Sequence, residues 1–326
     1  MRMKAIVHEK YGASDVLQLK EVERPTPGDD EVLVEVRAAS LNAYDWHFLR
    51  ADIFLIRLMG GGLLKPRNTR LGADIAGRVE AVGRNIQQFK PGDEVFGDIG
   101  SFGHGGFAEY VSVPERALTL KPANLSFQEA AAVPMAALTA LQGLRDAGHL
   151  QPGQKVLIQG ASGGVGTFAL QIARWLGAEV TAVCSPRNLD MARALGADHV
   201  IDYTKEDFTQ NKQRYDLILA VNGYHPLSAY RRALAPRGIY VMAGGSPAQI
   251  FQAMLLGPML SSAGGRKFGG LTTRLNQMDM SLLKELLEAG KVIPVIDGCY
   301  PLSETAEAFR YFEKVHARGK VVITMK

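Results

Sequence analysis

The chain has 326 residues, of which 47% are hydrophobic and 21% charged, with a formal net charge of +4. This length predicts two domains with large apolar cores. Its basic residues are dispersed, which argues against nucleic-acid binding. No apolar run approaches the ~20 residues of a membrane helix, and the first ten residues lack the apolar core of a signal peptide. The two cysteines, Cys184 and Cys299, form no paired or metal-spaced motif, so we expect a cytoplasmic protein.

The first third of the chain predicts a β-rich domain. Short segments of β-forming residues alternate with turns that contain proline and glycine. These segments are KAIVH, DVLQLKEV, EVLVEVRAAS, IAGRVEAVG and FAEYVSVP. No long helix is expected there.

After Pro122 the pattern changes to helices alternating with apolar strands. Ser126 with Glu129 three residues later predicts the capped start of an alanine-rich helix. The strands that follow are VLIQG, EVTAV, HVIDY, LILAV and GIYVMAG. This alternation predicts a parallel, doubly wound α/β sheet. From about Leu271, the sequence predicts two more helices and two more strands.

The segment VLIQGASGGVG, residues 156–166, is typical of a dinucleotide-binding turn. A strand leads into glycines and then into a helix, so a pyrophosphate can approach backbone N–H groups at the helix N-terminus. The pattern is A-x-G-G-x-G, with Ala161 at the position of the first glycine. A merely structural strand-to-helix turn is the alternative. The candidate cofactor-binding residues in this turn are Gly160, Ser162, Gly163, Gly164 and Val165.

The end of the next strand predicts which nicotinamide cofactor is used. A carboxylate there would bind a ribose diol and repel a 2′-phosphate. The sequence instead has Ser185 and Arg187, and a guanidinium suits phosphate oxygens. We therefore expect NADPH, with Tyr203 as a third contact. The alternative is that Arg187 is only a solvated surface charge.

Ordered motifs cover almost the whole chain: MKAIV, PGDDEVLVEVRAASLN, LGADIAGRVEAVG, FKPGDEVFG, GGFAEYVSVP, AAVPMAALTAL, GASGGVG, LGADHVIDY and GKVVITM. In this order they resemble the medium-chain dehydrogenase/reductase (MDR) superfamily. The resemblance implies a GroES-like catalytic domain, residues 1–122 and 271–326, and a Rossmann dinucleotide-binding domain, residues 123–270.

Within that superfamily the chain is most similar to the zinc-free quinone oxidoreductase branch. This resemblance implies an oxidoreductase that uses NADPH to reduce quinones or the C=C bond of conjugated enones and enals. It also implies a homodimer. The pair Asp45-Trp46 resembles the subgroup of chloroplast-envelope and mitochondrial-type enzymes, which favours enone-type substrates by analogy.

The residues that would hold a catalytic zinc are missing. Such a site needs Cys or His at three matched positions, but the sequence has Asn42 at the first, Ala73 at the second, and neither Cys nor His in the segment AVPMA at the third. His47, His104 and Asp45 are the side chains from which a different metal site would be built. Isolated histidines are more often structural, so we expect no metal.

Without a metal, the protein has to stabilise negative charge on a carbonyl oxygen with its own donors. Asn42 is the first candidate because its amide is a hydrogen-bond donor. The alternative is that Asn42 only fixes the local turn. Tyr44 and His47 are the second and third candidates. Related quinone reductases often have a tyrosine at the position of His47, so that tyrosine's role does not carry over.

Other candidates for binding the nicotinamide half come from the resemblance and from strand ends. Thr139 matches the family position that faces the nicotinamide or its ribose, with a helix backbone hydrogen bond as the alternative. Ligands bind at the carboxyl edge of such sheets. Val221, Asn222 and Gly244 lie at the ends of later strands and should therefore line the site.

Two apolar stretches are candidates for contacts with the substrate and with a second subunit. Residues 53–66, IFLIRLMGGGLLKP, form either a lid over a hydrophobic cleft or a packed helix. Residues 250–262 lie where family members pair their subunits.

Three functions therefore remain open. The first is an NADPH-dependent quinone or enone reductase. The second is a zinc-free alcohol or aldehyde reductase. The third is an NADPH-binding sensor or structural partner with little turnover, because a glycine-rich turn binds cofactor whether or not chemistry follows.

Overall fold

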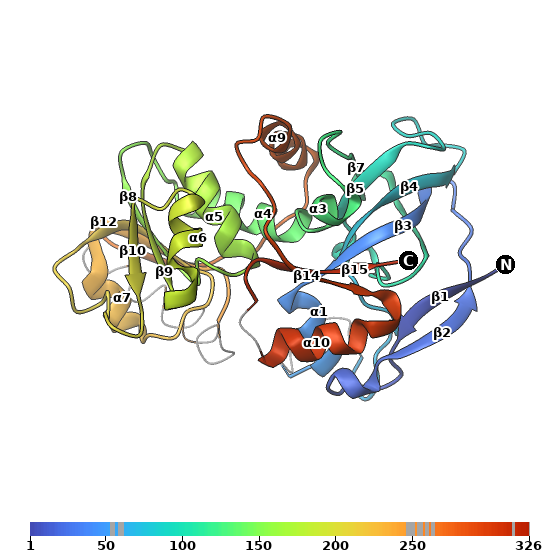
Figure 1. The fold of residues 1–326 in the computed structure, drawn as a ribbon, viewed down its shortest axis with the longest axis horizontal. Coiled ribbons are helices and arrows are strands. Elements are labelled where there is room, and N and C mark those ends of the chain that lie inside the picture. The colour runs from blue at the N-terminus through green and yellow to red at the C-terminus, as the bar shows by residue number, and fades with distance from the viewer. Residues whose placement is uncertain are drawn as a thin grey trace. The chain divides into compact units, whose positions relative to one another are not determined.

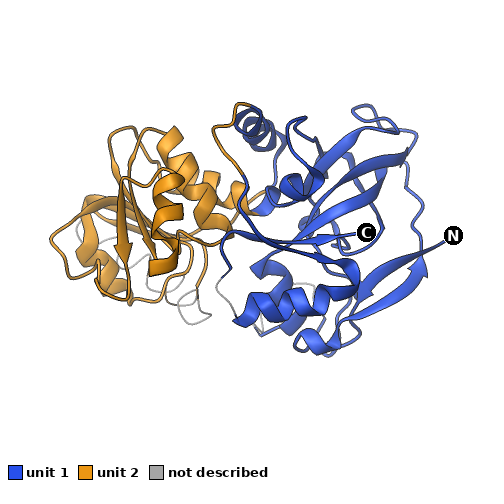
Figure 2. Cartoon of the chain, viewed as in Figure 1, with its two compact units in different colours: residues 1–135, 275–288, 294–326 blue, residues 136–274, 289–293 orange. Residues whose placement is uncertain are grey.

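The computed structural model describes residues 1–52, 56–57, 62–245, 252, 257, 261, 265–314 and 317–325. The chain forms two compact units (Figure 2). Unit 1 comprises Met1–Met135, Leu275–Glu288 and Pro294–Lys326, and unit 2 comprises Ala136–Arg274 and Ala289–Ile293. The first boundary therefore lies at residue 135, where the sequence indicated 122. The reason is helix α3 (Phe127–Ala131), which packs on strands β3 and β4 of unit 1.

Paired strands in unit 1 are antiparallel, except β14 and β15, which pair in parallel. Strands β1 (Arg2–Val7) and β2 (Gln18–Glu23) form a separate hairpin. A seven-stranded sheet has the order β14-β15-β3-β4-β5-β7, and β6 pairs with β3. Its strands are β3 (Glu31–Leu41), β4 (Asp74–Val82), β5 (Glu94–Asp98), β6 (Tyr110–Pro114), β7 (Thr119–Leu120), β14 (Ile296–Pro301) and β15 (Lys320–Thr324). Its helices also include α1 (Ala43–Arg50), α9 (Gln277–Glu288) and α10 (Thr305–Lys314).

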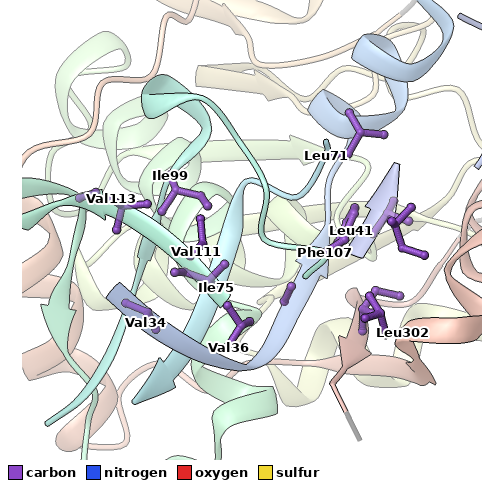
Figure 3. Close-up of a cluster of buried hydrophobic side chains, with 14 of the residues drawn as sticks. Val34, Val36, Leu41, Leu71, Ile75, Ile99, Phe107, Val111, Val113 and Leu302 are labelled. Atoms are coloured by element: carbon purple, nitrogen blue, oxygen red, sulfur yellow. The ribbon is translucent and has the colours of Figure 1, made fainter. Parts of the chain in front are cut away.

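The core of unit 1 is formed by apolar residues on strands of this sheet. Figure 3 shows members from β3, β4 and β6 gathered in one cluster, among them Val36, Ile75 and Val111. Alternation along each strand sends these side chains to the buried face. Phe107 and Phe309 join them with ring centroids 6.0 Å apart, which ties helix α10 to this cluster.

Unit 2 contains the predicted parallel sheet. Its six strands have the order β10-β9-β8-β11-β12-β13, and every neighbouring pair is parallel. The strands are β8 (Lys155–Gln159), β9 (Glu179–Cys184), β10 (His199–Asp202), β11 (Tyr215–Ala220), β12 (Leu234–Met242) and β13 (Lys267–Gly270). The helices are α4 (Pro134–Gln142), which begins in unit 1, α5 (Gly164–Trp175), α6 (Leu189–Ala194) and α7 (Leu227–Ala233). Figure 1 shows α5 and α6 beside β9.

This strand order reverses direction at β8. The chain runs outward from β8 through β9 to β10, then returns to β11 on the other side of β8. The point between β8 and β11 is where doubly wound folds bind ligands. The predictions of a β-rich domain and of a doubly wound parallel sheet are therefore confirmed.

One local feature differs from the sequence prediction. Ser126 caps a helix as expected, with its Oγ accepting from the N–H of Glu129 at 3.2 Å. However, that helix ends at Ala131, and Pro134 begins a separate helix because a proline lacks the N–H that a continuing helix needs. The short helix α1 interrupts the β-rich region, where no long helix was expected. In the part of the chain that the structure describes, no helix is long and apolar enough to cross a membrane.

Candidate functional site

In the turn after β8, the backbone geometry requires a glycine at two positions. Gly160 has a positive φ of 81°, which side chains rarely adopt. A Cβ on Gly166 would lie 2.2 Å from the carbonyl oxygen of Gly160. Gly166 therefore lets helix α5 approach the end of β8 closely, which is the close helix–strand packing of a dinucleotide-binding turn.

Gly163 and Gly164 have a different role from Gly166. A Cβ on Gly163 would be 3.6 Å from its nearest neighbour, so no packing contact requires a glycine there. Gly163 is the N-cap of the twelve-residue helix α5, and Ser162, Gly164 and Val165 beside it are partly exposed. The first N–H groups of a helix have no intrahelical acceptor and favour anions. The N–H of Gly163 itself donates to the carbonyl of Gly160 at 3.2 Å, so the first N–H groups of α5 after it are the ones that fit a pyrophosphate.

The ends of β11 and β12 meet the glycine turn. The N–H of Val221 donates to the carbonyl of Gln159 at 3.0 Å, and Asn222 lies 3.2 Å from a Cβ built on Gly160. A Cβ on Gly244 would lie 2.4 Å from the carbonyl oxygen of Val221. The structure thus brings Val221, Asn222 and Gly244 together with the turn at the switch point of the sheet.

The ends of β9 and β10 form the other side of this edge. The two strands pair in parallel with Asp202 opposite Cys184, so Tyr203 and Ser185 follow paired positions. The N–H of Tyr203 donates to the carbonyl of Cys184 at 3.4 Å, and Tyr203 is 46% exposed. Arg187 is also exposed, and Ser185 is half-buried. The residues expected at a 2′-phosphate therefore lie in the loop after β9 and at the adjacent end of β10, where Arg187 and Tyr203 are exposed.

Thr139 lies on α4 and is largely buried in unit 2. Its hydroxyl is 3.2 Å from that of Thr273, which follows β13. One turn later on the helix, the amide of Gln142 donates to the carbonyl of Arg274 at 2.7 Å and accepts from the N–H of Arg274 at 2.9 Å. These contacts join α4 to the segment after β13.

In unit 1, Asn42 belongs to a buried polar network. Its side chain is 7% exposed, and its Nδ2 donates to Asp74 at 2.9 Å and to the carbonyl of Ser40 at 3.4 Å. Its Oδ1 accepts from the ammonium of Lys320. Both amide hydrogens are thus engaged within the protein, and the side chain holds the turn before α1. This geometry is that of the alternative in which Asn42 fixes the local structure.

Asp74 and Lys320 are the charged centre of this network. Their side chains are 0% and 3% exposed, and Lys320 Nζ lies 3.3 Å from Asp74 Oδ2. Asp74 also accepts from the hydroxyl of Ser40 at 3.0 Å and from the N–H of Met135 at 3.0 Å. A buried carboxylate needs such partners to remain ionised.

Two more carboxyl groups share this buried region. Asp45 accepts from the N–H groups of Asn42 at 3.0 Å and Gly72 at 2.9 Å, and Asp98 accepts from that of Gly100 at 2.8 Å. Burial raises the pKa of Asp45 to about 7, and burial together with the charge of Asp74 raises the pKa of Asp98 to about 7. Lys320 alone does not balance three carboxylates, so protons are retained here near neutral pH.

Tyr44 is the least committed of the three catalytic candidates. It is half-buried, and its hydroxyl makes a long hydrogen bond of 3.4 Å to the carbonyl of Gly100. Burial raises the pKa of Tyr44, so its O–H keeps its proton. The ring stacks on His104 at 5.2 Å, and burial lowers the pKa of His104 to about 4. Tyr44 is therefore a neutral phenol beside a neutral imidazole.

The three side chains considered for a different metal site have separate partners. His47 Nδ1 lies 3.0 Å from Asp52, His104 stacks on Tyr44, and Asp45 accepts backbone hydrogen bonds. Among the described residues, no group of three His, Cys, Asp or Glu side chains is arranged to hold a metal ion. Half of residues 53–66, where a lid or packed helix was expected, and most of the second stretch at 250–262 lie outside the described residues.

Sequence reasoning missed the partners of Asn42. Asp74 and Lys320 are separated from it by 32 and 278 residues. One signal was present, since each is a charged residue that begins a strand and is followed by three apolar or small residues, in LGADIAG and GKVVITM. A charge in such a position is expected to be paired.

Comparison with known families and proteins agrees with this architecture. Residues 28–123 match the family described as alcohol dehydrogenase GroES-like domain, and residues 195–323 match the family described as zinc-binding dehydrogenase. The solved quinone oxidoreductase from Coxiella burnetii superimposes with a TM-score of 0.87 at 29% identity, over 100% of both chains.

Two curated relatives align over almost the whole chain. A chloroplastic quinone oxidoreductase of Triphysaria versicolor is 33% identical over 98% of both proteins. A chloroplastic NADPH-dependent alkenal/one oxidoreductase of Arabidopsis thaliana is 33% identical over 98% of this chain and 79% of its own length. The chain belongs to the medium-chain dehydrogenase/reductase superfamily, among its quinone oxidoreductases and enone reductases, and is an oxidoreductase.

Proposed function

We propose that this oxidoreductase uses NADPH, without a catalytic metal, to reduce quinones or the C=C bond of conjugated enones and enals. One observation carries the proposal: the glycine turn at the sheet's switch point adjoins a strand end with Ser185 and Arg187 in place of a carboxylate. The names of the two curated relatives supply the substrate classes.

NADPH is favoured over NADH by the chemistry of the β9 end. A hydroxyl and a guanidinium attract a 2′-phosphate, whereas a carboxylate would repel it. The nearby carboxylate of Asp202, on β10, is engaged by the N–H and hydroxyl of Thr204 at 2.9 and 2.7 Å. Tyr203 is exposed beside it and adds a phenol to the proposed site.

Bound NADPH would supply hydride, and the protein would bind and polarise the acceptor. Reduction of an enone consumes one hydride and one proton and gives a saturated carbonyl. The negative charge that develops is delocalised onto the carbonyl oxygen, so one good hydrogen-bond donor gives useful stabilisation. Quinones and enones therefore suit a site that lacks a Lewis acid.

Tyr44 is the residue we propose for this donor. Its phenol is protonated and half-buried. To donate to a substrate oxygen, it has to give up only its long hydrogen bond to the carbonyl of Gly100. Asn42 would first have to release Asp74 or Ser40. We therefore assign Asn42 to positioning the turn that carries Tyr44. His47 remains a candidate for relaying a proton, since it pairs with Asp52 on the same segment.

Metal independence is proposed from the donor set of unit 1. Asn42 and Ala73 stand where zinc ligands would be needed, and the amide of Asn42 is held by Lys320 and Asp74. Neither residue offers the thiolate or imidazole that Zn²⁺ prefers. A cytoplasmic location and a homodimer are further proposals, based on cysteine usage and on the family resemblance respectively.

The test measures oxidation of NADPH and NADH by protein treated with a chelator. The acceptors are a quinone, an aryl enone, a short enal and a saturated aldehyde. We expect turnover on the first three, none on the aldehyde, and a lower KM for NADPH than for NADH. Tyr44→Phe should lower kcat more than it raises KM, because the donor acts on developing charge.

Other outcomes would contradict specific parts of this proposal. Turnover of the aldehyde would favour an alcohol or aldehyde reductase. Binding of NADPH without oxidation by any acceptor would favour a sensor or structural partner. Activity that is lost on chelation and restored by Zn²⁺ would overturn metal independence.

A further inference from the structure

A buried asparagine lies behind the loop that carries Ser185 and Arg187. Asn188 is 1% exposed, and its Nδ2 donates to the Oγ of Ser185 at 3.0 Å. Its backbone N–H donates to the carbonyl of Ser185 at 2.9 Å, which closes the short 3₁₀ turn over Pro186–Asn188. The side chain and the backbone of Asn188 thus both bind Ser185, but only the side chain contacts its hydroxyl.

The direction of the side-chain hydrogen bond determines what Ser185 can offer to a ligand. A serine hydroxyl has one hydrogen to donate and lone pairs to accept with. Because Asn188 donates to the oxygen, that hydrogen is left for another acceptor. A phosphate is an acceptor at neutral pH, so a hydroxyl oriented in this way is matched to phosphate and not to a donor group.

The side chain of Asn188 is buried, but one of its two polar atoms has no partner within the described ranges of the chain. Among the described residues, the Oδ1 of Asn188 has no hydrogen-bond partner. A buried amide oxygen without a hydrogen-bond partner is energetically unfavourable. The side chain also makes no capping hydrogen bond to helix α6, although it occupies the N-cap position. Within the part of the chain that the structure describes, its one side-chain hydrogen bond is the one to Ser185.

We propose that Asn188 is a positioning residue for cofactor specificity, which orients the Ser185 hydroxyl as a donor to the 2′-phosphate of NADPH. The inference rests on the NADPH preference of the proposed function. It assigns part of that preference to a residue that does not itself touch the cofactor.

The test measures binding of two cofactor fragments by calorimetry, with no turnover required. Adenosine 2′,5′-bisphosphate and 5′-AMP differ only by the 2′-phosphate, so the ratio of their Kd values isolates its recognition. Asn188→Leu should lower the preference for the bisphosphate about tenfold, the value of a hydrogen bond to a charged group. Asn188→Asp should lower it further, because a carboxylate would take the Ser185 hydrogen and repel the phosphate.

Matched variants separate orientation from charge and from folding. Asn85→Asp changes the same charge on an exposed residue of unit 1 and should leave the ratio unchanged. Asn188→Asp keeps the size of the side chain, so it serves if Asn188→Leu does not fold. In a Ser185→Ala background, Asn188→Leu should have no further effect on the ratio, because the group that it orients is gone.

The two proposals fail in different ways. Wild-type protein that binds both fragments equally would overturn the NADPH preference and the role of Asn188 with it. Wild-type protein that prefers the bisphosphate, with Asn188→Leu or Asn188→Asp keeping the whole preference, would overturn the role of Asn188 alone. An equal loss of affinity for both fragments would also overturn it, since this would indicate a structural defect.

Discussion

The two units prepare their candidate sites by opposite means. Unit 2 presents backbone: Gly163 leaves the N-terminus of α5 without a side chain, and Gly166 lets the helix approach the end of β8 closely. Unit 1 presents side chains held by buried charge, with Asn42 between Asp74 and Lys320. The glycine turn is sensitive to added side-chain volume. The network in unit 1 is sensitive to the loss of one charged partner, because the other charge is then buried without a counter-charge.

The largest effect is expected from breaking the charged pair in unit 1. Lys320→Met leaves the buried Asp74 carboxylate without its cation and should lower the free energy of unfolding by about 3 kcal/mol. Urea unfolding at neutral pH measures this change. Addition of Asp74→Asn in the same chain should recover part of the loss, because the unpaired charge is removed.

A surface lysine provides the matched control. Lys284 on α9 pairs with Glu288 at 2.7 Å, one helical turn away. Lys284→Met should change the free energy of unfolding by less than about 0.5 kcal/mol, as is typical of exposed ion pairs. Equal stability of Lys320→Met and Lys284→Met would show that the buried pair contributes nothing special.

The next largest effect is a difference in stability between two glycine substitutions in the turn of unit 2. Gly166→Ala places a Cβ 2.2 Å from the carbonyl oxygen of Gly160, so it should destabilise the cofactor-free protein by about 1–3 kcal/mol. Gly163→Ala meets no atom closer than 3.6 Å and should change that stability much less. Thermal unfolding without cofactor compares the two variants.

Cofactor binding then separates packing from ligand contact. Gly163→Ala should weaken NADPH binding despite its near-normal stability, because a methyl group is added where the pyrophosphate is proposed to lie. Normal affinity in a stable Gly163→Ala protein would move the pyrophosphate away from this residue.

The smallest effect concerns the protons held in unit 1. The pKa of Asp98 is raised from 3.8 to about 7, so the folded protein binds that proton more tightly than the unfolded chain. Stability is therefore lost as pH rises from about 4 to about 7. Asp98→Asn retains an oxygen for the N–H of Gly100 and removes this loss. Relative to wild type, the variant should gain about 2 kcal/mol more at pH 8 than at pH 5.

Urea unfolding at the two pH values measures this gain. A difference between variant and wild type that is the same at pH 5 and pH 8 would mean that Asp98 ionises normally in the folded protein. In that case, Lys320 would have to balance more than one carboxylate in the network.

The sequence was most informative where function depends on neighbouring residues. The parallel sheet, the turn at residues 156–166 and the cap at Ser126 were all predicted from contiguous patterns. Backbone geometry is encoded locally, since Gly160 and Gly166 lie within one short segment. The break at Pro134 was also readable, but the alanine-rich pattern around it favoured one continuous helix.

The network in unit 1 could not be predicted in the same way. Asn42 was expected to offer its amide to a substrate, and the structure engages that amide with Asp74 and Lys320. Only strand pairing brings β15 next to β3, where Val321 lies opposite Leu41. Helix α1 had a local signal, Asn42 followed by Asp45 three residues later, but the strand-like residues around it masked this signal.

The most direct test of the account follows deuterium from doubly labelled [4,4-²H₂]NADPH into an aryl enone, with chelator-treated protein. The account predicts deuterium at the β-carbon of the saturated product, at a rate that added Zn²⁺ does not change. Transfer that requires Zn²⁺, or deuterium found on a carbinol carbon, would contradict it.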